Sequence, residues 1–194
     1  MSLVVRSYAA ESLVLSPVEL WARLRCPPEQ MQEQLDIWIP RVCAASVCRA
    51  CAMEVDISRT DGLQIGPISM QNRALDILLR DCDRAILMAA TLGAGVDRLL
   101  MQTAVRSPAD QFVADAVASA LVEALCDRVE EDLCGLRPHT HRFSPGYVIL
   151  PLEIQPEFLK LLDAHRQIGI ALTDRLLMTP TKSVTAILGL RNPT

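Results

Sequence analysis

The sequence predicts an α+β fold, in which an antiparallel or mixed sheet carries several helices and one helix is long. Apolar residues keep helical spacing from Ser107 to Leu133, whereas residues 49–57 alternate between apolar and polar side chains as on a half-buried strand. Helical and strand-like segments do not alternate regularly, which favours α+β over a doubly wound sheet. Because no linker, repeat or low-complexity tract interrupts the chain, residues 1–194 are expected to form a single domain.

Prolines and small polar residues mark the elements of the first part of the chain. Prolines at the start of each segment predict helices over 17–25 and 28–39, and Pro40 is expected to interrupt the second. After the strand, a turn is expected over 62–67. Ser69 is expected to cap a helix that reaches about residue 81.

The second part of the chain contains the clearest helix signal. Residues 85–93 form a short apolar run that ends in glycine, which predicts a buried strand. Ser107 and Pro108 supply a cap and a proline at the first helical position, and Gly135 is placed to end the long helix. The remaining elements are expected as a helix near 154–163 and strands near 168–172 and 183–190.

Composition excludes several classes of protein. The net charge is -4 and the basic residues are scattered, which argues against a nucleic-acid partner. No apolar run is long enough for a membrane span, and the first residues do not have the pattern of a signal peptide. The sequence therefore predicts a cytoplasmic globular protein without a membrane partner.

Seven cysteines, an odd number, indicate reduced thiols in place of a disulfide framework. Cys43, Cys48 and Cys51 are spaced C-x4-C-x2-C with Cys82 downstream, which is the outline of a plant-type [2Fe–2S] ligand set. Such clusters lie in glycine-rich loops, but no glycine lies between Cys43 and Cys51. Buried thiols are therefore the favoured interpretation, and no metal site is predicted.

Two further motifs match ligand-site patterns imperfectly. DAHRQIG, residues 163–169, is close to the D-x-H-x-x-G signature of cobalt-ligating histidines, but an additional residue precedes the glycine. His165 is therefore interpreted as a solvated side chain near a helix end. TLGAGVD, residues 91–97, follows a strand as the glycine loop of a nucleotide-binding protein does, but it lacks the third glycine, so a dinucleotide site is not favoured.

Two segments toward the C-terminus resemble the activation domain of cobalamin-dependent methionine synthase. They are RFSPGY at 142–147 and LTDRLLMTPTKSV at 172–184. In that family an R-P-x-P-G-Y segment and an L-T-[ED]-x-x-x-M-x-P-x-x-S-V segment recur in this order. The helix before them, with ASALVEALCDRVEEDL at 118–133, is similar to that of small stand-alone relatives. The resemblance implies an activation-domain-like α+β fold over most of the chain.

Domains of this family bind S-adenosylmethionine and present its methyl group to cobalamin that oxidation to Co(II) has inactivated; one-electron reduction and methyl transfer restore methylcobalamin. The resemblance implies an S-adenosylmethionine site made of Arg142, Phe143, Ser144, Pro145, Gly146 and Tyr147. Arg142 is suited to hold the ligand carboxylate with two charge-assisted hydrogen bonds, and the Ser-Pro-Gly turn lets the backbone approach the ligand. Tyr147, expected at the rim toward the corrin, is the candidate catalytic residue.

The resemblance also implies partners. Cobalamin would be supplied by a corrinoid module of a methionine synthase, and the electron by a donor such as a flavoprotein. The chain would then be an accessory component of that methyltransferase and not a complete enzyme alone.

Departures from the family pattern leave alternatives open. Phe143 replaces a proline, and aliphatic residues replace an aromatic run whose tyrosine lines the ligand: these are Ala186, Ile187 and Leu188. One alternative is a non-catalytic S-adenosylmethionine-sensing or regulatory protein of the same fold. Another interpretation pairs Arg142 with Glu130 or Glu131 and packs Tyr147 beside the long helix.

Overall fold

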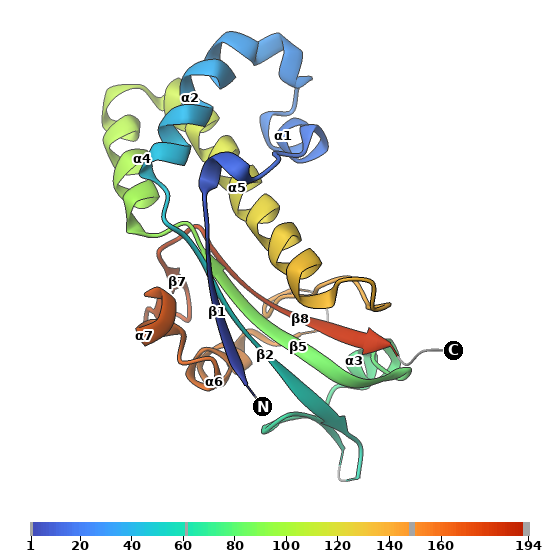
Figure 1. Ribbon diagram of the computed structural model, residues 1–194. Helices are drawn as coiled ribbons and strands as arrows, with labels where there is room; N and C mark the ends of the chain where they lie inside the picture. Colours follow the sequence, from blue (N-terminus) through green and yellow to red (C-terminus); the bar gives the residue numbers. More distant parts are fainter. Residues whose placement is uncertain (1, 61, 148–149, 192–194) are drawn as a thin grey trace.

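A six-stranded antiparallel sheet runs through the middle of the molecule (Figure 1). The computed structural model describes residues 2–60, 62–147 and 150–191. The strand order is β4-β3-β2-β5-β8, and β1 pairs with β2. The strands are β1 (Leu3–Tyr8), β2 (Cys48–Ser58), β3 (Leu63–Ile65), β4 (Ile68–Met70), β5 (Cys82–Thr91) and β8 (Ser183–Arg191). A separate two-stranded sheet is formed by β6 (Ala171–Leu172) and β7 (Met178–Thr179).

Helices cover both faces of the sheet (Figure 1). One layer consists of α1 (Pro17–Leu24), α2 (Gln32–Ala45), α4 (Ala94–Arg106) and α5 (Pro108–Cys134). The other layer consists of α3 (Arg73–Leu78), α6 (Gln155–Leu161) and α7 (Ala164–Ile168). Short 3-10 turns are η1 (Ala10–Ser12), η2 (Pro28–Met31) and η3 (Leu152–Ile154).

The central strand β5 is covered on both sides because its side chains are apolar in both directions. Met88 and Ala90 pack into the core beneath α5, whereas Leu87 and Ala89 pack into the core beneath α6 and α7. All four side chains are fully buried. A continuous apolar run is the pattern expected for such a strand, and the buried strand predicted at 85–93 is confirmed with shifted ends.

The long helix α5 packs against β5 and β8. Ser107 Oγ accepts a hydrogen bond from the Asp110 N–H (3.2 Å), and the helix ends at Gly135, where φ is 56°. Small buried side chains let neighbouring elements pack closely against the helix: these include Ala114, Ala118 and Ala120. The long helix predicted from Ser107 is confirmed, and so is an α+β fold with an antiparallel sheet.

The outer edge of β8 is only partly paired by another segment. Thr140 N–H donates to Gly189 O (2.9 Å), and Phe143 N–H donates to Ile187 O (3.0 Å). The chain therefore runs beside the C-terminal half of β8, where it bonds to Ile187 and Gly189, and turns away before the N-terminal half of the strand, whose residues Ser183, Thr185 and Ala186 are buried.

Several expected boundaries are wrong. The interruption expected at Pro40 does not occur, because α2 continues to Ala45 with Pro40 on its exposed side while Trp38 and Val42 anchor the opposite side in the core. Ser69 does not cap a helix, because it lies in strand β4.

Asn72 caps the following helix instead, accepting a hydrogen bond from Leu75 N–H (3.1 Å). The turn expected over 62–67 is confined to Gly66 and Pro67, which join β3 to β4, because residues 63–65 form β3. Strand β1 was not predicted from the sequence, and the strand expected near 168–172 is shortened because α7 occupies its first residue.

No helix in the described part of the chain has the length and apolarity needed to cross a membrane.

Candidate functional site

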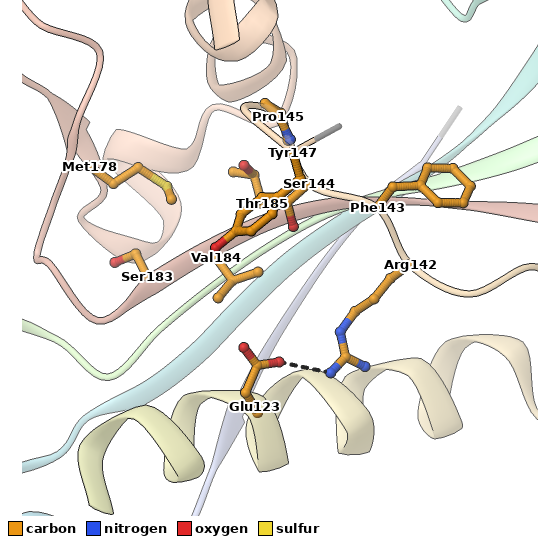
Figure 2. A pocket seen from close by; sticks show the side chains of 10 residues that line it. All are labelled: Glu123, Arg142, Phe143, Ser144, Pro145, Tyr147, Met178, Ser183, Val184 and Thr185. Carbon is orange, nitrogen blue, oxygen red and sulfur yellow. Dashed lines mark hydrogen bonds and ion pairs between the residues drawn. The ribbon is translucent and has the colours of Figure 1, made fainter. Parts of the chain in front are cut away.

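A pocket of about 620 Å³ lies between α5, the N-terminal half of β8 and the turn after Arg142 (Figure 2). We call it the edge pocket. Its volume lies in the range of small-molecule sites. Both sequence segments that carry the resemblance contribute to it, although they are far apart in the chain. The lining residues are Glu123, Arg142, Phe143, Ser144, Pro145, Tyr147, Met178, Ser183, Val184 and Thr185.

Strand β8 turns backbone groups toward the edge pocket. Ile187 exchanges two hydrogen bonds with Phe143, so both of its backbone groups point away from β5. Backbone direction repeats at every second residue of a strand, and Thr185 therefore presents its N–H and C=O on the same outer side. The paired segment turns away at Ser144, and the β8 edge borders the pocket at Thr185, which is itself buried.

The turn that forms the pocket rim is held by local hydrogen bonds. Tyr147 N–H donates to Ser144 O (3.2 Å), and Gly146 N–H donates to Leu150 O (2.8 Å). Gly146 has a φ of 87°, and an added Cβ would lie 3.3 Å from a Leu152 methyl group. A glycine is therefore required by the turn itself, in a backbone region that other residues rarely adopt.

Arg142 reaches from this turn to α5, where its guanidinium pairs with Glu123 (Figure 2) and with two further carboxylates of the helix. Nη2 lies 2.9 Å from Glu123 Oε2, and Nη1 lies 2.6 Å from Asp127 Oδ1 and 2.9 Å from Glu130 Oε2. Burial by itself lowers the pKa of Arg142, but the negative groups around it raise that pKa overall. Arg142 is a fixed cation, and the ion pair with Glu130 that the sequence allowed is present.

The polar residues of α5 that contact Arg142 and Lys182 form one line along the helix. Their spacing of three or four residues places them on the same helix face. We call them the polar stripe: Asp115, Ser119, Glu123, Asp127 and Glu130. Arg142 contacts the last three, and Lys182 Nζ contacts the first two at 2.8 Å each. Both resemblance segments are thus attached to one face of α5 by one cation each.

Two further side chains extend the network. Arg23 Nη2 on α1 lies 3.7 Å from Glu123 Oε1. His139 Nε2 lies 2.9 Å from Glu130 Oε1, and its Nδ1 lies 2.8 Å from Arg137 O. The carboxylates of the polar stripe are therefore shared between cations from three parts of the chain.

Five of the six residues expected to bind the ligand line the edge pocket: Arg142, Phe143, Ser144, Pro145 and Tyr147. Gly146 shapes the turn and faces a neighbouring hollow that Tyr147 also lines. Tyr147 is 71% exposed, so it does not pack beside α5 as the alternative interpretation required.

Sequence reasoning missed Glu123 as a site residue. Its signal was a lone acid in an apolar stretch, four residues before Asp127 and seven before Glu130. The pocket residues contributed by β7 and β8 were recognised as part of a motif but not as ligand-facing: they are Met178, Ser183, Val184 and Thr185.

The cysteines of the C-x4-C-x2-C pattern do not converge on one point. Cys43 and Cys48 pack into the core on the α5 side of the sheet, whereas Cys51 and Cys82 pack into the core on the opposite side. The sheet therefore separates them, which rules out their joint ligation of one iron–sulfur cluster. All seven cysteines are free thiols.

The remaining motifs have structural roles in the part of the chain that the structure describes. The glycine-containing turn at 91–97 joins β5 to α4, but β5 has antiparallel neighbours on both sides, which is not the parallel arrangement of a dinucleotide-binding fold. His165 is exposed on α7, as expected.

Comparison with known proteins gives a consistent result. Residues 81–192 match the family model described as "Vitamin B12 dependent methionine synthase, activation domain". The fold is similar to a solved structure titled "Crystal Structure of the MetH Reactivation Domain bound to AdoHcy", with a TM-score of 0.71 and 14% identity over 100% of this chain and 80% of that chain. The curated proteins gave no match.

Proposed function

The chain belongs to the activation-domain family of vitamin B12-dependent methionine synthase, and we propose that its edge pocket binds S-adenosylmethionine in support of cobalamin reactivation. The sulfonium of this ligand supplies a transferable methyl group. The solved reactivation domain carries AdoHcy, the demethylated form of the same molecule, which supports the choice of ligand.

The observation that carries the proposal is the pair of opposite charges in the pocket wall. Glu123 and Arg142 both line the edge pocket and lie 2.9 Å apart. An amino-acid group carries an ammonium and a carboxylate on adjacent positions, so a carboxylate beside a guanidinium is complementary to it. The methionine part of S-adenosylmethionine has this pair of charges.

Arg142 keeps donors for a ligand although α5 holds it. A guanidinium has five N–H donors, and the contacts with Glu123, Asp127 and Glu130 engage three of them. The remaining donors can hold a ligand carboxylate. Because three carboxylates surround one arginine here, the cationic ammonium and sulfonium are best placed toward Glu123.

The rest of the pocket suits an adenosine group. Apolar surface comes from Phe143, Pro145 and Val184, against which a planar base can pack. Thr185 offers a backbone donor and acceptor, and the Ser144 hydroxyl can bond polar atoms of a ribose or base. A mostly apolar wall with a few polar groups is typical of nucleoside sites.

Tyr147 is proposed to act on a partner. It lines the edge pocket and also a second hollow of about 540 Å³, and its side chain is largely exposed. A residue at this rim can contact a second molecule while the ligand lies behind it. We assign that second molecule as the corrin of a methionine synthase or related corrinoid protein, with a flavoprotein as the class of electron donor.

Titration calorimetry with S-adenosylmethionine tests the proposal directly. The protein should bind the ligand, and Glu123→Gln should weaken binding by about 1 to 2 kcal/mol because a charge-assisted hydrogen bond becomes a neutral one. Glu131→Gln, which changes an exposed acid of the same helix, is the matched control and should bind as the wild type does. No heat of binding from the wild type would refute the ligand assignment.

A sensor that binds the ligand without supporting chemistry is the second candidate. Ala186, Ile187 and Leu188 stand where the resembling domains carry an aromatic run, and all three are fully buried. These side chains pack in the two cores and not in the edge pocket. This favours a pocket with fewer ligand contacts than the family pattern implies.

A further inference from the structure

The turn before β8 is attached to α4 through Thr181. Thr181 N–H donates to Asp97 Oδ2 (2.9 Å), and the Thr181 hydroxyl donates to Asp97 Oδ1 (2.6 Å). Asp97 lies in the first turn of α4, within the 91–97 segment. One carboxylate thus fixes both the backbone and the side chain of a single turn residue.

The next residue attaches the same turn to α5. Lys182 Nζ lies 2.8 Å from Asp115 Oδ1 and donates to Ser119 Oγ (2.8 Å). The Lys182 side chain is 15% exposed and that of Asp115 is 44% exposed, so the lysine end of this ion pair is largely shielded from solvent. Leu92 N–H also donates to Lys182 O (3.0 Å), which joins the turn to the end of β5.

These contacts lie directly behind the wall of the edge pocket. Ser183, the next residue, lines the pocket; its hydroxyl donates to Pro180 O (2.7 Å), and its Oγ lies 2.8 Å from Thr91 Oγ1. Met178 lines the pocket on the other side of the turn. The position of both lining residues therefore depends on how firmly the turn is held.

We propose that Asp97 and Lys182 are positioning residues for S-adenosylmethionine, because they fix the turn that places Met178 and Ser183 in the pocket wall. The proposal rests on the proposed function. Neither residue touches the pocket, so they act through the turn. A wall that is ordered before binding spares the ligand the entropy cost of ordering it.

The two attachments are a property of this chain and not of the resemblance. Thr181 and Lys182 occupy the unspecified positions of the P-x-x-S-V pattern. Lys182 and Arg142 also meet the same polar stripe of α5, so the helix sets the spacing between the two segments that enclose the pocket. Loss of the Lys182 contact should loosen one side of the pocket and leave the Arg142 side intact.

Replacement of each positioning residue tests the proposal. Lys182→Met and Asp97→Asn should each weaken S-adenosylmethionine binding about three- to tenfold in titration calorimetry. Lys160→Met and Asp81→Asn change an exposed lysine and an exposed aspartate far from the turn in sequence, and should leave binding unchanged. Lys182→Arg should recover most of the affinity, because it restores a cation beside Asp115.

Hydrogen exchange of the free protein supplies a readout that global stability does not determine. In Lys182→Met and Asp97→Asn, peptides that cover residues 178–185 should exchange faster, while peptides from α5 and β5 should exchange as in the wild type. Unchanged exchange and unchanged affinity in both variants would overturn the proposal. Uniformly faster exchange across the protein would also overturn it, because the residues would then support overall folding.

Failure of the proposed function has a different signature. If the wild type does not bind S-adenosylmethionine, the ligand assignment falls, and the exchange data on residues 178–185 still decide whether Asp97 and Lys182 order the turn. If the wild type binds and the two variants bind equally well, the proposed function stands and the positioning role is wrong.

Discussion

Arg142 is the residue on which the proposed ligand binding should depend most directly. Arg142→Ala should weaken S-adenosylmethionine binding by about 1.5 to 3 kcal/mol in titration calorimetry, because it removes charge-assisted hydrogen bonds to the ligand carboxylate. Arg142→Lys should recover only part of the loss, since an ammonium cannot reproduce the planar geometry of a guanidinium.

The control for this change must account for the carboxylates that Arg142 leaves behind. Arg142→Ala removes the partner of Glu123, Asp127 and Glu130, so the melting temperature should fall as well. Arg128→Ala removes an exposed arginine from α5 and should change neither quantity much. Equal ligand affinity of wild type and Arg142→Ala would remove Arg142 from the site.

The sequence could identify Arg142 but not its surroundings. Its position in RFSPGY marks it as a candidate, whereas its contact with Glu123 joins residues 19 positions apart that belong to different elements. The acids of α5 show helical spacing, so a common face could be predicted from sequence. Which cations reach that face depends on the path of the turns, and local sequence patterns do not determine that path.

At the scale of elements, strand β2 determines which core each of its cysteines, Cys48 and Cys51, enters. Successive side chains of a strand point to opposite faces, so Cys48 and Cys51, three residues apart, enter different cores. Burial raises the pKa of each thiol to about 12. Buried neutral thiols of this kind pack as small apolar groups.

These raised pKa values predict a loss of stability at alkaline pH. Below about pH 9 the thiols of Cys48 and Cys51 are neutral in both the folded and the unfolded chain, so the stability that neutral burial allows is fully present. Between about pH 9 and 12 the unfolded chain ionises first and is favoured. The urea midpoint should therefore fall from pH 8 to pH 10, and Cys48→Ala with Cys51→Ala should reduce the slope; a midpoint independent of pH would contradict this.

Elements with a local signal were predictable and elements defined by partners were not. The strong cap at Ser107 and the buried run of β5 gave correct elements because each pattern is complete within the segment. The helix interruption predicted at Pro40 was wrong because the tertiary packing of α2 outweighs one missing hydrogen bond. Strand β1 exists through its pairing with β2, which a local pattern does not reveal.

At the scale of the molecule, the edge pocket lies where three kinds of structure meet: a long helix, a sheet edge and a turn. α5 supplies charge, β8 supplies backbone groups, and the turn supplies Tyr147 at the rim. The sequence resemblance indicated two of these three contributions. The pocket itself could not be predicted, because it depends on the paired segment leaving β8 at Ser144.

The last prediction separates a reactivation component from a sensor. If Tyr147 contacts the corrin, Tyr147→Ala should slow reactivation about tenfold and spare S-adenosylmethionine affinity, because its partner is absent from the binary complex. Tyr147→Phe should slow it less, since the ring remains, and Tyr8→Phe, at a tyrosine bonded to Asp132, is the control. The assay combines this protein, the ligand, a reductant and a truncated synthase in the Co(II) state, and follows methylcobalamin by absorbance.

Each outcome of this assay assigns a different role to Tyr147 or to the protein. Wild-type reactivation rates in both Tyr147 variants would show that the tyrosine does not contribute to reactivation. The corrin contact would then have to lie elsewhere on the rim. Ligand binding without methylcobalamin from any corrinoid partner would favour the sensor. Because Ile187 and Leu188 are core residues, restoring aromatic side chains there would overpack the cores before it restored a ligand contact. In such a sensor, the packing of the cores as well as the shape of the pocket would therefore prevent the aromatic ligand contact from being restored.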